Sequence, residues 1–181
     1  MTGTNDPGMR TAPRRELGTS VLRGALGGLL AGAVFIGLTM WFAASMGNPA
    51  TQPFLLISTI LLGADAMMTG AASVWLGVVV HAVLSIVFGI VFALVAPPFG
   101  TNGTTALAGG LYGLLLYVVN FVVLGMTVLP QFQMPNQPFE LVVHVVYGHL
   151  LALFLYSVGA RRGERFLALG TGARPSGASR G

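Results

Sequence analysis

Two of the three histidines in this 181-residue sequence share a spacing pattern. His81 lies between Gly77 and Ser85 in a run of small residues spaced four apart, and His144 lies four residues before Gly148. Because residues i and i+4 share one face of a helix, both imidazoles are expected to face other helices and not lipid. An imidazole inside a helical bundle can ligate a haem iron, exchange protons or form a hydrogen bond between helices.

Other polar residues are expected near these histidines. Glu140 precedes His144 by four residues, a spacing that permits a direct pair, and Tyr117 could supply a hydroxyl group. Polar groups at membrane depth cost free energy unless they are paired, so they mark candidate functional positions. The predicted cofactor-binding set is His81, His144, His149, Tyr147 and Asn120.

Four uses of His81 and His144 are open. They could be the axial ligands of a haem b, part of a quinone or proton-handling site with Glu140 and Tyr147, or ligands of a metal. They could also form structural hydrogen bonds between helices or to a partner subunit, which is the interpretation that the sequence favours. The loops expected outside the cell carry no arginine or lysine for haem propionates, which argues against haem, and no set of metal ligands is assigned.

The composition places these residues in a membrane. Charged residues make up 8% of the chain, against about 25% in soluble domains, and 54% of the chain is hydrophobic. No charged residue occurs between Gly24 and Ala64, or again from Ala66 to Phe139. Such a chain cannot cover a soluble surface with charge, so it is expected to be an integral membrane protein in a lipid bilayer. The absence of cysteine excludes disulfides, thiolate metal sites and cysteine nucleophiles.

Four apolar stretches are each longer than the ~20 residues that cross a bilayer. The predicted spans are Val21 to Met46, Ser73 to Ala96, Thr105 to Leu129, and Phe139 to Ala160. Residues 54–64 are also apolar, but they are too few to cross and Asp65 follows them. The sequence therefore predicts an all-α fold of four transmembrane helices, with a short re-entrant or interfacial helix near 54–70.

The arginines predict the orientation. Four of them lie at or before the start of the first span, and three directly follow the last: Arg10, Arg14, Arg15 and Arg23, then Arg161, Arg162 and Arg165. Positive residues flank the cytoplasmic ends of membrane helices, which favours membrane topology over nucleic-acid binding and requires an even number of crossings. Residues 1–20 and 163–181 are thus expected to be disordered cytoplasmic tails of a cell (inner) membrane protein, around a transmembrane domain of residues 21–162.

Two halves of that domain resemble each other. Residues 21–98 contain TQPF and then GVVVHAVLS, and residues 104–162 contain NQPF and then LVVHVVYG. This pattern predicts two tandem helical hairpins, a parallel repeat about an axis along the membrane normal, in which His81 and His144 are counterparts. Small residues spaced by four predict close helix packing at Gly24, Gly28, Gly32, Gly77, Ser85, Gly89, Gly109, Gly113 and Gly148.

One further pattern is a resemblance. GGLYGxxxYxxNF over Gly109 to Phe121 and HxxYG over His144 to Gly148 resemble segments of small uncharacterised multi-pass membrane proteins found in bacteria. The resemblance is confined to these two segments and implies no activity.

The favoured function is an accessory or structural subunit of a larger membrane complex, with an electron-transfer complex as the partner class. No nucleophile–base pair, carboxylate couple or phosphate-binding glycine loop occurs in the sequence, so the chain alone is not expected to be an enzyme. The alternative is a haem b- or quinone-binding membrane protein that uses His81 and His144. A small-solute transporter is the third candidate.

Overall fold

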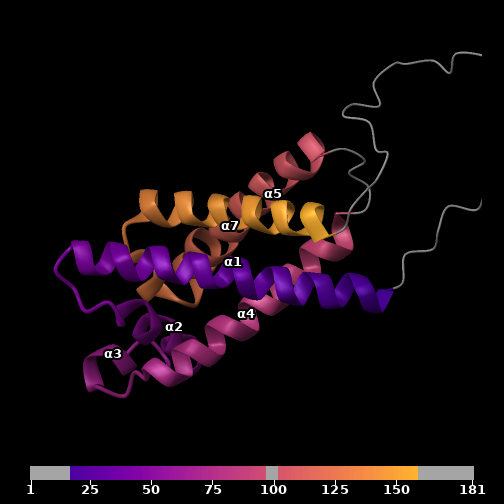
Figure 1. Cartoon of the computed structure of the whole chain (residues 1–181). Coiled ribbons are helices and arrows are strands. Elements are labelled where there is room, and N and C mark those ends of the chain that lie inside the picture. Colours follow the sequence, from indigo (N-terminus) through magenta and orange to yellow (C-terminus); the bar gives the residue numbers. More distant parts are fainter. Residues whose placement is uncertain (1–16, 97–101, 159–181) are drawn as a thin grey trace, which may run out of the picture.

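The computed structural model describes residues 17–96 and 102–158, which fold into helices without a strand (Figure 1). The third long helix is continuous from Asn102 to Thr127 and includes one π-helical turn, η1. Four helices are long and apolar enough to cross a membrane, which confirms the predicted all-α architecture with four such helices. They are α1 (Leu17–Ser45), α4 (Val74–Val95), the run of α5 (Asn102–Tyr117), η1 (Val118–Val123) and α6 (Leu124–Thr127), and α7 (Gln137–Val158).

The bundle has two different ends (Figure 1). The start of α1 and the end of α7 lie at one end, here the terminal end. The opposite end, here the loop end, carries the short helices α2 (Gln52–Leu62), α3 (Ala66–Thr69) and η2 (Pro130–Gln133). Trp41 near the end of α1 and Trp75 at the start of α4 are 65% and 80% exposed, and both lie toward the loop end. Exposed tryptophans at one level of a bundle are typical of a membrane interface.

Glycines bring α1 and α4 into backbone contact. A Cβ atom added at Gly28 would fall on the carbonyl group of Ser85, and one added at Gly89 would overlap the backbone of Gly24 and Gly28. Only glycine permits this approach, because any side chain would separate the two helices.

The pair α5 and α7 packs in the same way. A Cβ atom at Gly113 would fall on the carbonyl of His144, and one at Gly148 would fall on the carbonyl of Gly109. All nine positions that the sequence predicts as packing residues are buried, and Gly77 serves the contact of α4 with Phe54 of α2.

These contacts give a register that differs from the predicted one. Gly28 meets the carbonyl of Ser85 on α4, and Gly113 meets the carbonyl of His144 on α7. If the two helix pairs are superposed on these contacts, Ser85 corresponds to His144, and Glu140, one helical turn earlier, corresponds to His81. On that superposition His81 and His144 differ by about one helical turn, whereas the sequence match pairs them directly.

The segment between α1 and α4 forms two short helices that pack beside the long ones. Ser58 and Thr59 of α2 are fully buried, and the Ser58 hydroxyl accepts a hydrogen bond from the Ser73 N–H at 3.1 Å. Gly63 (φ 87°) and Gly70 (φ 75°) end α2 and α3 in backbone conformations that favour glycine. With 11 residues α2 is too short to cross a bilayer.

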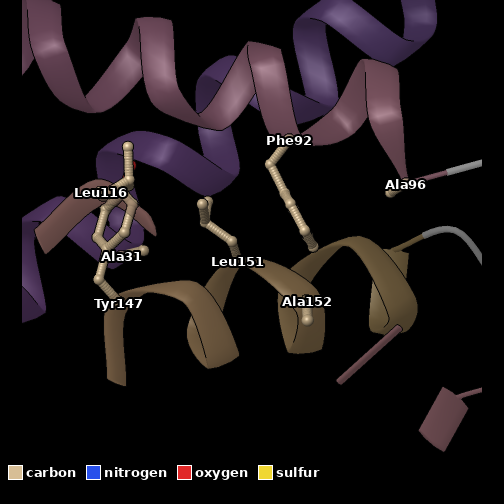
Figure 2. Close-up of a cluster of buried hydrophobic side chains, with 7 residues drawn as sticks. All are labelled: Ala31, Phe92, Ala96, Leu116, Tyr147, Leu151 and Ala152. Atoms are coloured by element: carbon tan, nitrogen blue, oxygen red, sulfur yellow. The ribbon is translucent and has the colours of Figure 1, made fainter. Parts of the chain in front are cut away.

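The buried hydrophobic core lies in the half of the bundle toward the terminal end. All four long helices contribute side chains to one cluster, shown in Figure 2, in which Leu151 is fully buried. Its members are Ala31, Phe92, Ala96, Leu116, Tyr147, Leu151 and Ala152. The half of the bundle toward the loop end contains a cavity.

Candidate functional site

A cavity of about 610 Å³ occupies the half of the bundle toward the loop end. Its lining includes Leu116 and Tyr147, which also belong to the core cluster and therefore form its floor. It also includes the exposed residues Asn48, Met134 and Asn136, which lie in the connections at the loop end. The cavity therefore reaches the surface at the loop end and is closed toward the terminal end.

Phenylalanine is the most frequent residue type in the cavity wall. Six phenylalanines line it, and the rings of Phe42 on α1 and Phe139 on α7 stack with centroids 3.9 Å apart. The rings of Phe121 and Phe132 meet edge to face at 5.4 Å. The six are Phe35, Phe42, Phe88, Phe121, Phe132 and Phe139. Such a wall suits an apolar or aromatic ligand.

His81 lines this cavity from α4. Its Nε2 lies 2.9 Å from the main-chain oxygen of Gly32 on α1, and the Ser85 hydroxyl lies 3.4 Å from the same nitrogen. A carbonyl oxygen only accepts, so Nε2 carries the hydrogen and donates it. In the neutral ring Nδ1 then has a free lone pair.

His144 lines the same cavity from α7 and is held in a similar way. Its Nδ1 donates to the main-chain oxygen of Glu140 at 2.7 Å, which leaves Nε2 as the acceptor of the neutral ring. The ring of Phe35 contacts both imidazoles, with centroids 6.0 Å from His81 and 4.8 Å from His144. The structure thus places both histidines inside the bundle, beside one cavity.

Glu140 brings a carboxyl group into this apolar space. It lies in the first turn of α7, which begins after Asn136, whose side chain accepts the Phe139 N–H at 3.0 Å. Glu140 is 9% exposed and lines the cavity. Its Oε2 lies 4.0 Å from Nδ1 of His144, beyond hydrogen-bond distance, and the hydrogen on that nitrogen is donated to a carbonyl.

Asn120 and Tyr147 also line the cavity, with different roles. Asn120 lies in the π-helical turn η1, a feature that often marks functional sites. Gln133 donates to the main-chain oxygen of Phe121 in the same turn. The hydroxyl of Tyr147 donates to the main-chain oxygen of Ser85 at 3.1 Å, so it links α7 to α4 and its hydrogen is not free for a ligand.

His149 does not belong to this group. Its side chain is exposed, lies against Gly110 of α5, and has its Nδ1 2.8 Å from the main-chain oxygen of Val145. It is not among the residues that line the cavity. Of the predicted set, the structure therefore brings together His81, His144, Asn120 and Tyr147, and leaves His149 outside.

The sequence patterns did not indicate three glutamines whose side chains form hydrogen bonds in and around the connection that precedes α7. Gln131 donates to the Thr59 hydroxyl of α2 at 2.9 Å, across 72 residues of sequence. Gln137 donates to the main-chain oxygens of Phe132 and Pro135, both at 3.0 Å, and accepts from Tyr117 at 3.2 Å. Together with the Gln133 contact described above, these bonds hold the loop against the mouth of the cavity. The only available signal was the repetition of glutamine in a proline-rich loop.

Neither family models, nor curated proteins, nor solved structures gave a match to this chain. The site is therefore described by its own geometry. Within residues 17–96 and 102–158, no three histidine, cysteine, aspartate or glutamate side chains are grouped so that they could hold a metal ion. The fold and site define a helical membrane protein with an aromatic cavity that contains two histidines and one carboxyl group.

Proposed function

We propose that this chain is a membrane-embedded binding protein for a small apolar ligand, which enters the cavity at the loop end. The observation that carries the proposal is the cavity of about 610 Å³ between helices that are elsewhere in backbone contact. Protein interiors have few voids larger than a water molecule, whereas ligand pockets measure about 300–1,000 Å³. An aromatic wall with a few polar groups is also typical of ligand pockets.

The hydrogen bonds of the histidines bear on the predicted cofactors. A quinone carbonyl needs a donor, but His81 and His144 each donate their ring N–H to a main-chain carbonyl. A haem b ligated by both imidazoles would need the space between them, and the ring of Phe35, which contacts both imidazoles, lies there. The two histidines thus favour a ligand that donates hydrogen bonds to them over a quinone or a haem b that they would hold.

Two other predicted functions are compatible with such a site. An accessory subunit of a larger membrane complex can hold a ligand for that complex, and a small-solute transporter would use the same cavity. Neither receives separate support from the packing of the described residues. The ligand site is therefore the function that we put forward.

We further propose that the loop end faces the outside of the cell and that both termini are cytoplasmic. Supporting observations are the arginines near the two chain ends and the exposed Trp41 and Trp75 toward the loop end. In this orientation α2 and α3 lie at the outer interface of an inner cell membrane.

We also propose that the pairs α1–α4 and α5–α7 are tandem copies of one hairpin. The support is their common glycine contacts and the sequence in that register, where FGIVFAL (88–94) aligns with YGHLLAL (147–153). An axis along the membrane normal would relate the two copies.

Filling part of the cavity should weaken ligand binding. Ala43 on α1 lines the cavity, and the neighbouring Ala44 is exposed and does not. With 1-naphthylmethanol as a fluorescent probe and the protein in lipid nanodiscs, the unsubstituted chain and Ala44→Trp should bind one probe per chain saturably. Ala43→Trp should bind at least about tenfold more weakly, a loss of about 1.4 kcal/mol. Equal, non-saturable uptake by all three proteins would show partition into lipid and would refute the proposal.

A further inference from the structure

The two histidines and Glu140 offer hydrogen-bond acceptors to a ligand, whereas the carboxamide of Asn120 can both donate and accept. The N–H groups of His81 and His144 are donated to main-chain oxygens, so Nδ1 of His81 and Nε2 of His144 present lone pairs. Neither nitrogen is among the fully buried atoms without a partner in the described part of the chain, so each is in contact with open space. The Glu140 carboxyl group adds two more acceptor oxygens when it is ionised. A ligand that pairs with His81, His144 and Glu140 must therefore supply hydrogen-bond donors.

The basic group nearest Glu140 in the described residues is the neutral imidazole of His144, whose Nδ1 lies 4.0 Å from Oε2, and no arginine lies beside it. The one arginine in that part of the chain, Arg23, lies 19 residues before Phe42, which stacks on Phe139 next to Glu140. At 1.5 Å per residue, Arg23 is about 28 Å away along α1. A charge in a membrane helix is costly unless it is paired, and it marks a functional position by default. The start of α7 favours a negative charge at Glu140, because the N-terminus of a helix carries a partial positive charge.

The aromatic wall points to the same kind of ligand. The faces of phenylalanine rings attract cations, and six phenylalanines line the cavity around Glu140 and the two histidines. We infer that the ligand is a lipophilic ammonium ion, a protonated amine on an apolar body, with Glu140 as its counter-charge and the imidazole lone pairs as hydrogen-bond acceptors. This inference rests on the proposed function, because it names the ligand class of the same cavity.

Two probes that have the same shape but differ in charge distinguish the effect of charge on binding from the effect of shape. 1-Naphthylmethylamine is protonated at neutral pH, and 1-naphthylmethanol is its neutral counterpart. In nanodiscs of zwitterionic lipid, the unsubstituted protein should bind the amine at least about tenfold more tightly than the alcohol, as expected for one charge-assisted hydrogen bond. Glu140→Gln should reduce amine affinity to that of the alcohol and leave alcohol affinity unchanged.

Asp65→Asn is the matched control. Asp65 is exposed, is outside the cavity lining, and is the other carboxylate of the described residues, so its substitution removes the same charge elsewhere. It should leave the binding of both probes unchanged. If amine affinity falls equally in both variants, or if Glu140→Gln weakens both probes alike, the inference is wrong while the ligand cavity stands. If neither probe binds the unsubstituted protein saturably, the proposed function itself fails.

Discussion

Alanine at position 28 should lower the unfolding temperature of the protein markedly, although the substitution adds a single methyl group. The added Cβ atom would fall on the Ser85 carbonyl and lie 3.1 Å from the Cα atom of Gly89. These are backbone atoms, so no side-chain rotation can make room and α1 must move away from α4. Overpacking of this kind costs about 1–3 kcal/mol. The effect is measurable as the thermal unfolding midpoint of the purified protein in nanodiscs.

Gly37→Ala provides the control in the same helix. Gly37 is exposed, and a Cβ atom there would have no neighbour within 4 Å. Alanine is the better helix former by about 0.5–1 kcal/mol, so this variant should be unchanged or slightly more stable. A similar loss of stability in both variants would mean that α1 and α4 are not in backbone contact at Gly28.

Leu151→Ala should produce the second large loss of stability. Leu151 is fully buried, and it lies in the core cluster with Phe92, Tyr147 and side chains from the other long helices (Figure 2). Truncation leaves a cavity whose walls lose their contacts, and buried leucine-to-alanine changes cost about 2–5 kcal/mol. Chemical or thermal unfolding of the reconstituted protein would measure the change.

The matched substitution is Leu153→Ala, two residues further along α7. Leu153 is 61% exposed and is expected to face lipid, so its truncation removes few contacts within the protein. It should change the free energy of unfolding by well under half of the Leu151→Ala effect. The reverse order would mean that α7 is rotated relative to the arrangement described above.

The fold class could be predicted because its signals are local. Long uncharged stretches such as 24–64 and 66–139 require a membrane, and a bilayer fixes the length of each crossing helix. The glycine positions could be predicted as well, because residues four apart share a helix face. Which helix each glycine meets, however, is a property of the assembled bundle.

The register of the two halves could not be derived from short sequence matches. Apolar helices repeat the same few residue types, so an alignment that slips by about one turn still looks similar. The sequence match pairs His81 with His144, whereas a superposition on the glycine contacts pairs Ser85 with His144. Backbone contact between Gly28 and Ser85 depends on the exact crossing of two helices, which no single segment encodes.

The sequence could indicate which face of each helix its histidines lie on, but not which residues from other helices they meet. His81 and His144 share a helix face with small residues, so they were expected inside the bundle, and both line the cavity. His149, one residue past Gly148, points elsewhere because one residue is about 100° of helix rotation. The contact of Phe35 with both imidazoles and the bond of Gln131 to Thr59 join residues distant in sequence, so no pattern indicated them.

Access to the cavity from the loop end can be tested with single cysteines, because the chain has no cysteine of its own. Asn120 lines the cavity, and Val119, the preceding residue in η1, is exposed on the helix surface and does not. A cationic, membrane-impermeant methanethiosulfonate reagent would be added to Asn120→Cys and Val119→Cys in nanodiscs, and the modified protein counted by mass spectrometry.

The cysteine at position 120 should react, because the reagent reaches it from the loop end, and the cysteine at position 119 should not, because lipid covers it. Bound 1-naphthylmethylamine should slow the reaction at position 120. No labelling at position 120, or equal labelling at both positions, would contradict the existence of a cavity open at the loop end.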